Sequence, residues 1–153
     1  MVEIIITNLY EGIVMLTTIA LEEYIKKEID SRLGEVNWNN IYFKKGYKNS
    51  IEGTYIYSKI SGYHILYVEK GKIREQRITL RKETVLLYVL EIVSFDIALN
   101  YAKRNRKGSE DFRKELFTKE IEIYSLFGTK YEKKKKREID KILEKNPYND
   151  VQL

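Results

Sequence analysis

The chain has 153 residues, of which 43% are hydrophobic and 33% charged, and its formal net charge is +5. These values are typical of one folded domain, residues 1–153, and exclude a disordered chain. The absence of cysteine excludes disulfides, thiolate nucleophiles and cysteine-ligated metals, and the N-terminus has no signal-peptide pattern, so we expect a cytoplasmic protein.

The predicted fold class is α+β, and its first clear element is an N-terminal helix. Apolar residues recur every three or four positions between Thr17 and Leu33, and Gly34 follows as a stop signal. The shorter apolar run Glu3 to Thr7 is equally compatible with a strand and with a helix. The N-terminal third is therefore predicted to be mainly one helix.

A three-stranded antiparallel meander is predicted next. Runs rich in Tyr, Ile and Val cover 54–60, 63–69 and 72–78. The dipeptides Ser61-Gly62 and Lys70-Gly71 separate them and are suited to two-residue hairpin turns. Alternation along the middle strand places apolar side chains on both faces, so both faces of the sheet are expected to be covered.

Three C-terminal helices are predicted after the meander. The first, from Leu80 to about Arg106, is apolar nearly all round, which favours a buried central position over a membrane span because it carries several polar groups. A second helix, capped by Ser109, runs to Gly128. A capping box of Thr129 and Glu132 opens a third helix that ends before Pro147.

No residue grouping in the sequence predicts catalysis, a cofactor or a metal. The single histidine, His64, lies in the middle of a strand and is interpreted as a packing residue. Glu91 and Asp96 are the other acid–base candidates, and burial in the long helix would raise their pKa values. Asp96 shares a helical face with Asn100 and Lys103, which indicates a polar seam that meets arginines of a neighbouring helix. We predict a protein that is not an enzyme.

Two basic runs, 103–107 and 133–137, raise the alternative of a small basic nucleic-acid-binding protein. The second run is flanked by Glu132, Glu138 and Asp140, a pattern typical of a solvated helix with ion pairs four residues apart. No aromatic stacking platform adjoins either run. Nucleic acid is therefore the less favoured partner.

The second half of the chain resembles a bacterial family. The pieces that carry the resemblance, spread over residues 63–150, are Tyr-Val-Glu-Lys-Gly at 67–71, Leu-Leu-Tyr at 86–88, Asn-Tyr-x-x-x-Asn-Arg at 100–106, Asp-Phe-Arg at 111–113 and Leu-x-x-x-Pro-Tyr-x-Asp at 143–150. Together they resemble immunity protein family 63, whose members protect bacteria from polymorphic toxins.

The resemblance implies a cytoplasmic protein that binds one cognate toxin and blocks it without chemistry of its own. Given the charge of +5, the toxin is expected to present an acidic or neutral surface. The motif residues Asn100, Tyr101, Arg106, Asp111, Phe112 and Arg113 are interpreted as structural. We expect Asp111 to pair with arginines across the turn between two helices, in a network of Arg104, Arg106, Asp111 and Arg113.

A crowd of tyrosines is the predicted partner-binding surface. Tyrosine combines a large contact area with a hydroxyl that tolerates water, so it is enriched in interfaces. Tyr55 and Tyr57 share one face of their strand, and Tyr63 and Tyr67 share one face of the next. We expect the toxin to contact whichever of these faces solvent, in the set Tyr42, Tyr47, Tyr55, Tyr57, Tyr63 and Tyr67.

Overall fold

The computed structural model of the protein describes residues 5–8 and 13–150. The chain forms two compact units, residues 1–90 and residues 91–153, which are taken in turn. All the strands of the described residues lie in the first unit, and the described part of the second unit is helical. The fold is therefore α+β, as the sequence predicts.

The first unit begins with a hairpin followed by the predicted helix. β1 (Ile5–Asn8) pairs antiparallel with β2 (Ile13–Leu16), so the described part of the ambiguous run is a strand. α1 (Thr18–Leu33) is capped at its start by the hydroxyl of Thr17, which accepts a hydrogen bond from the backbone N–H of Ala20. Gly34 ends the helix at φ 72°, a conformation that favours glycine.

The sheet has four strands, one more than predicted. Its order is β3-β4-β5-β6, formed by Ile41–Tyr42, Gly53–Lys59, Gly62–Glu69 and Lys72–Thr79. The last three are the predicted antiparallel meander, whereas the two-residue β3 pairs parallel with β4. The expectation of a purely antiparallel three-stranded sheet is thus corrected, because so short a parallel strand has no local turn signal.

The two hairpin turns differ from each other in how well they match the predicted positions. Lys70 and Gly71 form the turn between β5 and β6, both with positive φ, at 50° and 71°. The turn between β4 and β5 lies one residue earlier than predicted, because Lys59 pairs with Gly62 and leaves Ile60 and Ser61 at the tip. Gly62 is then the first residue of β5.

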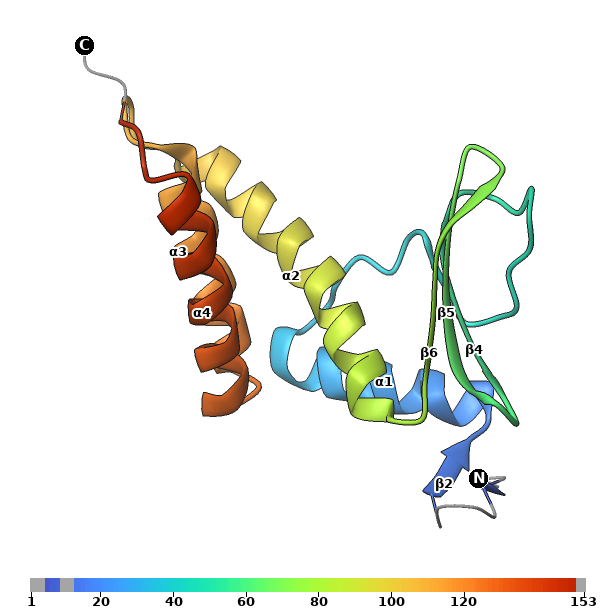
Figure 1. Cartoon of the computed structure of the whole chain (residues 1–153). Helices are drawn as coiled ribbons and strands as arrows, with labels where there is room; N and C mark the ends of the chain where they lie inside the picture. Colours follow the sequence, from blue (N-terminus) through green and yellow to red (C-terminus); the bar gives the residue numbers. More distant parts are fainter. Residues whose placement is uncertain (1–4, 9–12, 151–153) are drawn as a thin grey trace. The chain divides into compact units, whose positions relative to one another are not determined.

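The two faces of the sheet are covered by different parts of the first unit. The register places Ile56, Ile65 and Tyr63 on one face, which α1 and the first turns of α2 cover (Figure 1). Tyr55, Tyr57, His64, Leu66 and Val68 lie on the opposite face. A loop of residues 43–52 lies over this second face, which we call the loop-covered face.

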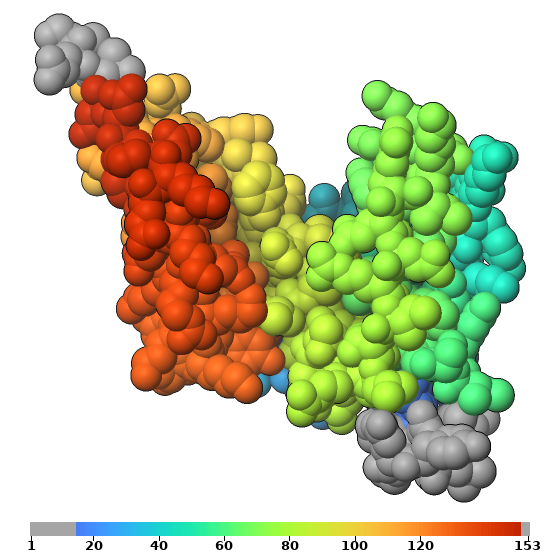
Figure 2. Space-filling view, in the orientation of Figure 1, coloured from blue at the N-terminus to red at the C-terminus, as the bar shows by residue number. Residues whose placement is uncertain are grey.

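β6 is an open edge of the sheet. It pairs with β5 on one side, and most of its residues are exposed, including Ile73 and Ile78 (Figure 2). Basic side chains recur along it at Lys72, Arg74 and Arg77.

α2 (Lys82–Asn105) is the predicted long helix and runs through both units without interruption. Several of its apolar residues are buried, as expected for a central helix, but Phe95 is 50% exposed, and Glu91 and Asp96 are exposed as well. The carboxylates of Glu91 and Asp96 are therefore not buried, in contrast to the prediction. Among the described residues, α2 alone is long and apolar enough to cross a membrane. Core helices of folded proteins have the same length and composition, so this helix does not indicate a membrane location.

The second unit packs α3 (Phe112–Ser125) and α4 (Thr129–Lys145) with the second half of α2. Its core cluster contains Ala98, Ala102, Leu116, Phe117 and Ile139.

Both predicted helix caps in this unit are wrong. Asp111, rather than Ser109, caps α3. Thr129 is already helical, and Gly128 precedes it without any side-chain cap, so no capping box forms.

Candidate functional site

The acid–base candidates of the sequence lie on two different elements. His64 is buried in β5, whereas Glu91 and Asp96 are exposed on α2. Among residues 5–8 and 13–150 no group of three His, Cys, Asp or Glu side chains could hold a metal ion.

His64 stacks on Tyr57 on the loop-covered face. Their ring centroids lie 5.1 Å apart with 14° between the planes, and Nε2 of His64 lies 2.8 Å from the hydroxyl of Ser61. Burial, followed by the positive charges of Lys59 and Lys45, lowers the pKa of His64. These causes favour the neutral form of the ring, which packs as part of the sheet.

The predicted tyrosine set is divided by burial. Tyr55, Tyr57 and Tyr63 are buried, with exposed fractions of 3%, 7% and 1%, so these three rings are not free for a partner. Tyr42 and Tyr67 are half-buried, and Tyr47 is 57% exposed. Of the six, Tyr47 alone offers most of its ring to solvent.

The two tyrosine pairs of the meander lie on opposite faces. Tyr55 and Tyr57 belong to the loop-covered face, where Tyr55 stacks on Tyr42 at 5.0 Å between ring centroids. Tyr63 and Tyr67 point to the face that the helices cover. There the Tyr63 hydroxyl accepts a hydrogen bond from the backbone N–H of Leu16 at 2.8 Å, and burial raises its pKa.

The loop 43–52 is fixed to the sheet at three points. Gly46 lies against the Tyr55 ring, the backbone N–H of Asn49 donates to the carbonyl of Gly71 at 3.1 Å, and the Tyr55 hydroxyl donates to the carbonyl of Ile51 at 2.6 Å. These contacts bury Tyr55 and attach the loop to the sheet. The sequence does not reveal them, because they join residues of the loop to residues outside it.

Lysines lie over the aromatic rings of this face. The ammonium nitrogens of Lys44, Lys45 and Lys59 lie 5.5, 5.1 and 5.7 Å from the ring centroids of Tyr42, Tyr47 and Tyr57. Such cation–π contacts each stabilise by about 0.5–1 kcal/mol at exposed sites. The result is a basic and aromatic surface with Tyr47 at its most exposed point.

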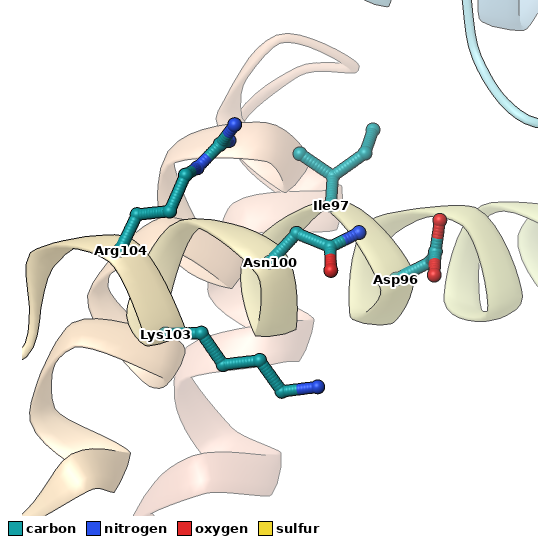
Figure 3. Close-up of a pocket in the computed structure, with 5 residues that line it drawn as sticks. All are labelled: Asp96, Ile97, Asn100, Lys103 and Arg104. Atoms are coloured by element: carbon teal, nitrogen blue, oxygen red, sulfur yellow. The ribbon is translucent and has the colours of Figure 1, made fainter.

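A shallow hollow of about 420 Å³ lies on α2, lined by Asp96, Ile97, Asn100, Lys103 and Arg104 (Figure 3). The expected polar seam of Asp96, Asn100 and Lys103 is thus present on one helical face. Its arginine, Arg104, comes from α2 itself rather than from a neighbouring helix.

The motif residue Asp111 organises the start of α3. Its carboxylate accepts hydrogen bonds from the backbone N–H of Arg113 at 2.9 Å and of Asn149 at 2.8 Å, and it pairs with the Arg113 guanidinium at 2.9 Å. The hydrogen bond from the Arg113 side chain, then those from the two backbone groups, hold the pKa of Asp111 well below its usual range.

The same network fastens the C-terminal residues. Arg113 donates to the carbonyls of Asn146 and Pro147 at 2.7 and 2.8 Å, and Lys114 pairs with Asp150 at 2.8 Å. We call this group the C-terminal clasp: Asp111, Arg113, Lys114 and residues 146–150. The expectation that Asp111 pairs across the α2–α3 turn is corrected, because its partner lies in its own helix.

The other motif residues have separate positions. Phe112 packs against the core of the second unit, and the Tyr101 ring lies beneath the ammonium group of Lys119 at 4.7 Å. Asn100, Arg104 and Arg106 are exposed. Neither arginine belongs to the clasp.

One buried ionic cluster was missed by sequence reasoning. Lys135 and Glu120 are each 7% exposed, and Nζ of Lys135 also lies 4.6 Å from the Tyr124 ring centroid. Lys135 belongs to a run of four lysines, a pattern typical of a solvated surface. The available signal was helical spacing, because Lys135 precedes the buried Ile139 by one turn.

The described features define a small α+β protein with a basic, aromatic surface and no assembled catalytic group among its described residues. A model of an immunity protein family, described as immunity protein 63, matches residues 59–141, more than half of the chain. The chain belongs to the immunity protein 63 family, which confirms the resemblance seen in the sequence. No curated protein matches the chain, and no solved structure does.

The family match divides the tyrosine set. It begins at Lys59 and covers Tyr63 and Tyr67, whereas Tyr42, Tyr47 and the loop 43–52 precede it. The clasp residues Asp111 and Arg113 lie within the match, and residues 146–150 follow it.

Proposed function

We propose that this protein neutralises one cognate bacterial toxin by binding it stoichiometrically in the cytoplasm, without catalysing a reaction. The observation that carries the proposal is the match to an immunity protein family over residues 59–141. The packing of His64 within the sheet and the exposure of Glu91 and Asp96 on α2 support a binding role. In this proposal residues 1–153 act as one immunity domain.

The toxin-contacting surface in this proposal is the exposed part of the predicted tyrosine set. Tyr47, 57% exposed, is its centre, and the half-buried Tyr42, which stacks on Tyr55, belongs to the same face of the sheet and its loop. The buried Tyr55 and Tyr57 support the surface from beneath. Because the rings are accompanied by Lys44, Lys45 and Lys59, the toxin surface that fits is acidic or neutral.

Nucleic-acid binding has less support from the contacts. In the second basic run, Lys134, Lys135 and Lys136 pair with Glu138 or Glu132, and Glu120 also contacts Lys135, so these charges are neutralised within the protein. The pattern favours the solvated helix surface that the flanking acidic residues predict. A salt titration with an oligonucleotide separates the alternatives, since phosphate contacts weaken steeply with salt.

The experiment that tests the proposal is co-expression with the toxin encoded beside this chain's gene. Restored growth, together with a one-to-one complex of the purified proteins measured by light scattering, is the expected result. The variant Tyr47→Ala tests the contact surface, since it should weaken the complex by more than about 2 kcal/mol if Tyr47 is a central contact. Failure of the wild-type protein to bind the toxin or to restore growth would overturn the proposal.

A further inference from the structure

The edge strand β6 carries two isoleucines on the same face of the sheet. Ile73 lies opposite Val68, a residue of the loop-covered face, and Ile78 lies opposite His64 on that same face. Because the two isoleucines are five residues apart, a regular strand would place them on opposite faces. The register leaves Arg74 without an opposite residue in β5, and this extra residue brings both isoleucines to one face.

The two isoleucines are exposed although they belong to the sheet. Ile73 is 45% exposed and Ile78 is 55% exposed, and Gln76, which lies between them on the same face, is exposed as well. Ile60, 80% exposed, lies at the tip of the adjoining hairpin, two residues before Gly62, whose backbone lies against Ile78. The edge of the sheet therefore presents a strip of apolar side chains to solvent.

The backbone of β6 has an open side. In the described sheet β6 is the last strand, and β5 is its one neighbour. Every second residue of an edge strand points its N–H and C=O away from the sheet, where another extended chain can pair with them. The eight residues of β6 are long enough for such pairing.

The charges along the edge favour an acidic partner. Residues 69–79 contain four basic and two acidic side chains. Arg74 pairs with Glu69 at 3.4 Å, and Arg77 pairs with Glu75 at 2.5 Å. All four side chains are more than a third exposed, and exposed ion pairs contribute little, so carboxylates of a partner can compete for the two arginines. A second copy of β6 would bring an excess of positive charge instead.

The edge adjoins the proposed tyrosine surface and lies within the family match. The loop that carries Tyr47 reaches the start of the edge, where the backbone N–H of Asn49 donates to the carbonyl of Gly71 at 3.1 Å. The match to the immunity family covers residues 59–141 and so includes all of β6, whereas Tyr47 precedes it. One toxin surface could therefore contact both features.

We propose that β6 is the docking edge for an extended acidic segment of the toxin, which adds to the sheet as a further strand. The inference rests on the proposed function, and it adds how the toxin is bound and which segment chemistry is recognised. Main-chain hydrogen bonds to β6 supply affinity. Apolar side chains of the added strand pack on Ile73 and Ile78, and its carboxylates pair with the basic residues of the edge.

Amide hydrogen exchange of the full-length protein, with and without the toxin, tests the added strand. In the free protein the outward-pointing amides of β6 should exchange rapidly, and in the complex they should slow at least about tenfold, alternating with amides that already bond to β5. Unchanged exchange along β6 in a complex that does form overturns the docking edge and leaves the proposed function standing.

Side-chain variants test the same edge by affinity. Ile73→Ser and Ile78→Ser should each weaken toxin binding about tenfold. Lys72→Glu should weaken binding and reduce its dependence on salt. The matched controls are Ile19→Ser and Lys27→Glu on α1, because Ile19 is 73% exposed and Lys27 is exposed as well. Losses no larger than those of the controls overturn the docking edge.

A pair of peptides tests the edge without the toxin. A hexapeptide of alternating glutamate and valine should slow the exchange of the outward amides of β6, and its lysine–valine counterpart should not. Equal effects of the two peptides, or none, overturn the acidic strand. If the acidic peptide protects β6 but the toxin does not bind the wild-type protein, the edge stands and the proposed function fails.

Light scattering tests the other occupant of the edge, a second copy of the chain. The free protein should be a monomer, as should Ile78→Ser. A wild-type dimer that Ile78→Ser converts to a monomer would place a second copy on β6 and overturn the proposal.

Discussion

Gly46 lies so close to Tyr55 that a Cβ atom at position 46 would come within 2.5 Å of Cγ of the ring. Real Cβ atoms do not approach a ring so closely, so the contact requires glycine. It is also the point at which the loop 43–52 is attached to the sheet. Any side chain at this position would have to move the loop or the ring.

We therefore predict that Gly46→Ala destabilises the first unit by about 1–3 kcal/mol, the usual cost of overpacking a buried site. It should also weaken toxin binding, since Lys45 and Tyr47 flank the displaced residue. Urea unfolding measures the first effect, and calorimetric titration with the toxin measures the second. Lys48→Ala in the same loop is the control and should leave stability nearly unchanged; equal stability of the Gly46→Ala protein would refute the close contact.

The buried pair of Lys135 and Glu120 yields a second prediction. Lys135→Met leaves Glu120 without its counter-charge, and breaking a buried pair in this way costs about 3–5 kcal/mol. Lys136→Met, which removes the exposed pair with Glu132, should cost under about 1 kcal/mol.

The rescue variant for this prediction is the double substitution Lys135→Met with Glu120→Leu. Replacing both charges by apolar side chains should recover most of the loss, because no unpaired charge stays buried. Denaturant unfolding of the four proteins gives the comparison. A double variant no more stable than Lys135→Met would show that the loss comes from packing instead of charge.

A third prediction concerns acid stability. The pKa of Asp111 is lowered from its ordinary value of 3.8, so its ionised form is favoured in the folded state. The contribution of Asp111 to the free energy of unfolding is therefore complete above about pH 4 and is lost as the pH falls below that value. Asp111→Asn keeps a cap acceptor but removes the charge, so its melting temperature should fall less between pH 5 and pH 3 than that of the wild type.

Asp111→Ala completes this series, because it removes both the charge and the cap. It should be less stable than Asp111→Asn at pH 7, and proteolysis should reach residues 146–150 sooner when the clasp is lost. Equal acid sensitivity of the wild type and Asp111→Asn would contradict the proposed role of the Arg113 contact.

The single histidine permits a fourth prediction. Burial, followed by the charges of Lys59 and Lys45, lowers the pKa of His64 in the folded state. Below pH 6.5 the histidine of the unfolded chain therefore binds a proton more readily than the folded one. As a result, His64 lowers the free energy of unfolding as the pH falls below 6.5. NMR titration should give a pKa below 6.5 for this ring. In Lys59→Gln the value should rise toward 6.5, and no change in that variant would show that the lysine does not reach the histidine.

Local signals explain which parts of the fold were predictable. Thr17 and Gly34 bracket α1 because caps depend on a few adjacent residues, and Lys70-Gly71 adopts the predicted turn for the same reason. The cap of α3 was misplaced because Ser109 and Asp111 are both suitable, and the choice depends on Arg113 and Asn149, which contact Asp111 in the folded chain.

Long-range contacts explain the rest. The parallel pairing of β3 with β4 carries no signal in either segment, and alternation showed which tyrosines share a face without showing what covers it. Tyr55 is buried by a glycine-containing loop that precedes it in the chain.

The open edge of β6 affects how the protein behaves at high concentration. An unpaired strand edge can template the addition of a second copy and so begin polymer growth. Charged side chains lie along this edge: Lys72 is exposed, Arg74 pairs with Glu69, and Arg77 pairs with Glu75. A second β6 laid against the edge would remove these charges from water, so the edge favours separate molecules over polymers even in concentrated solution.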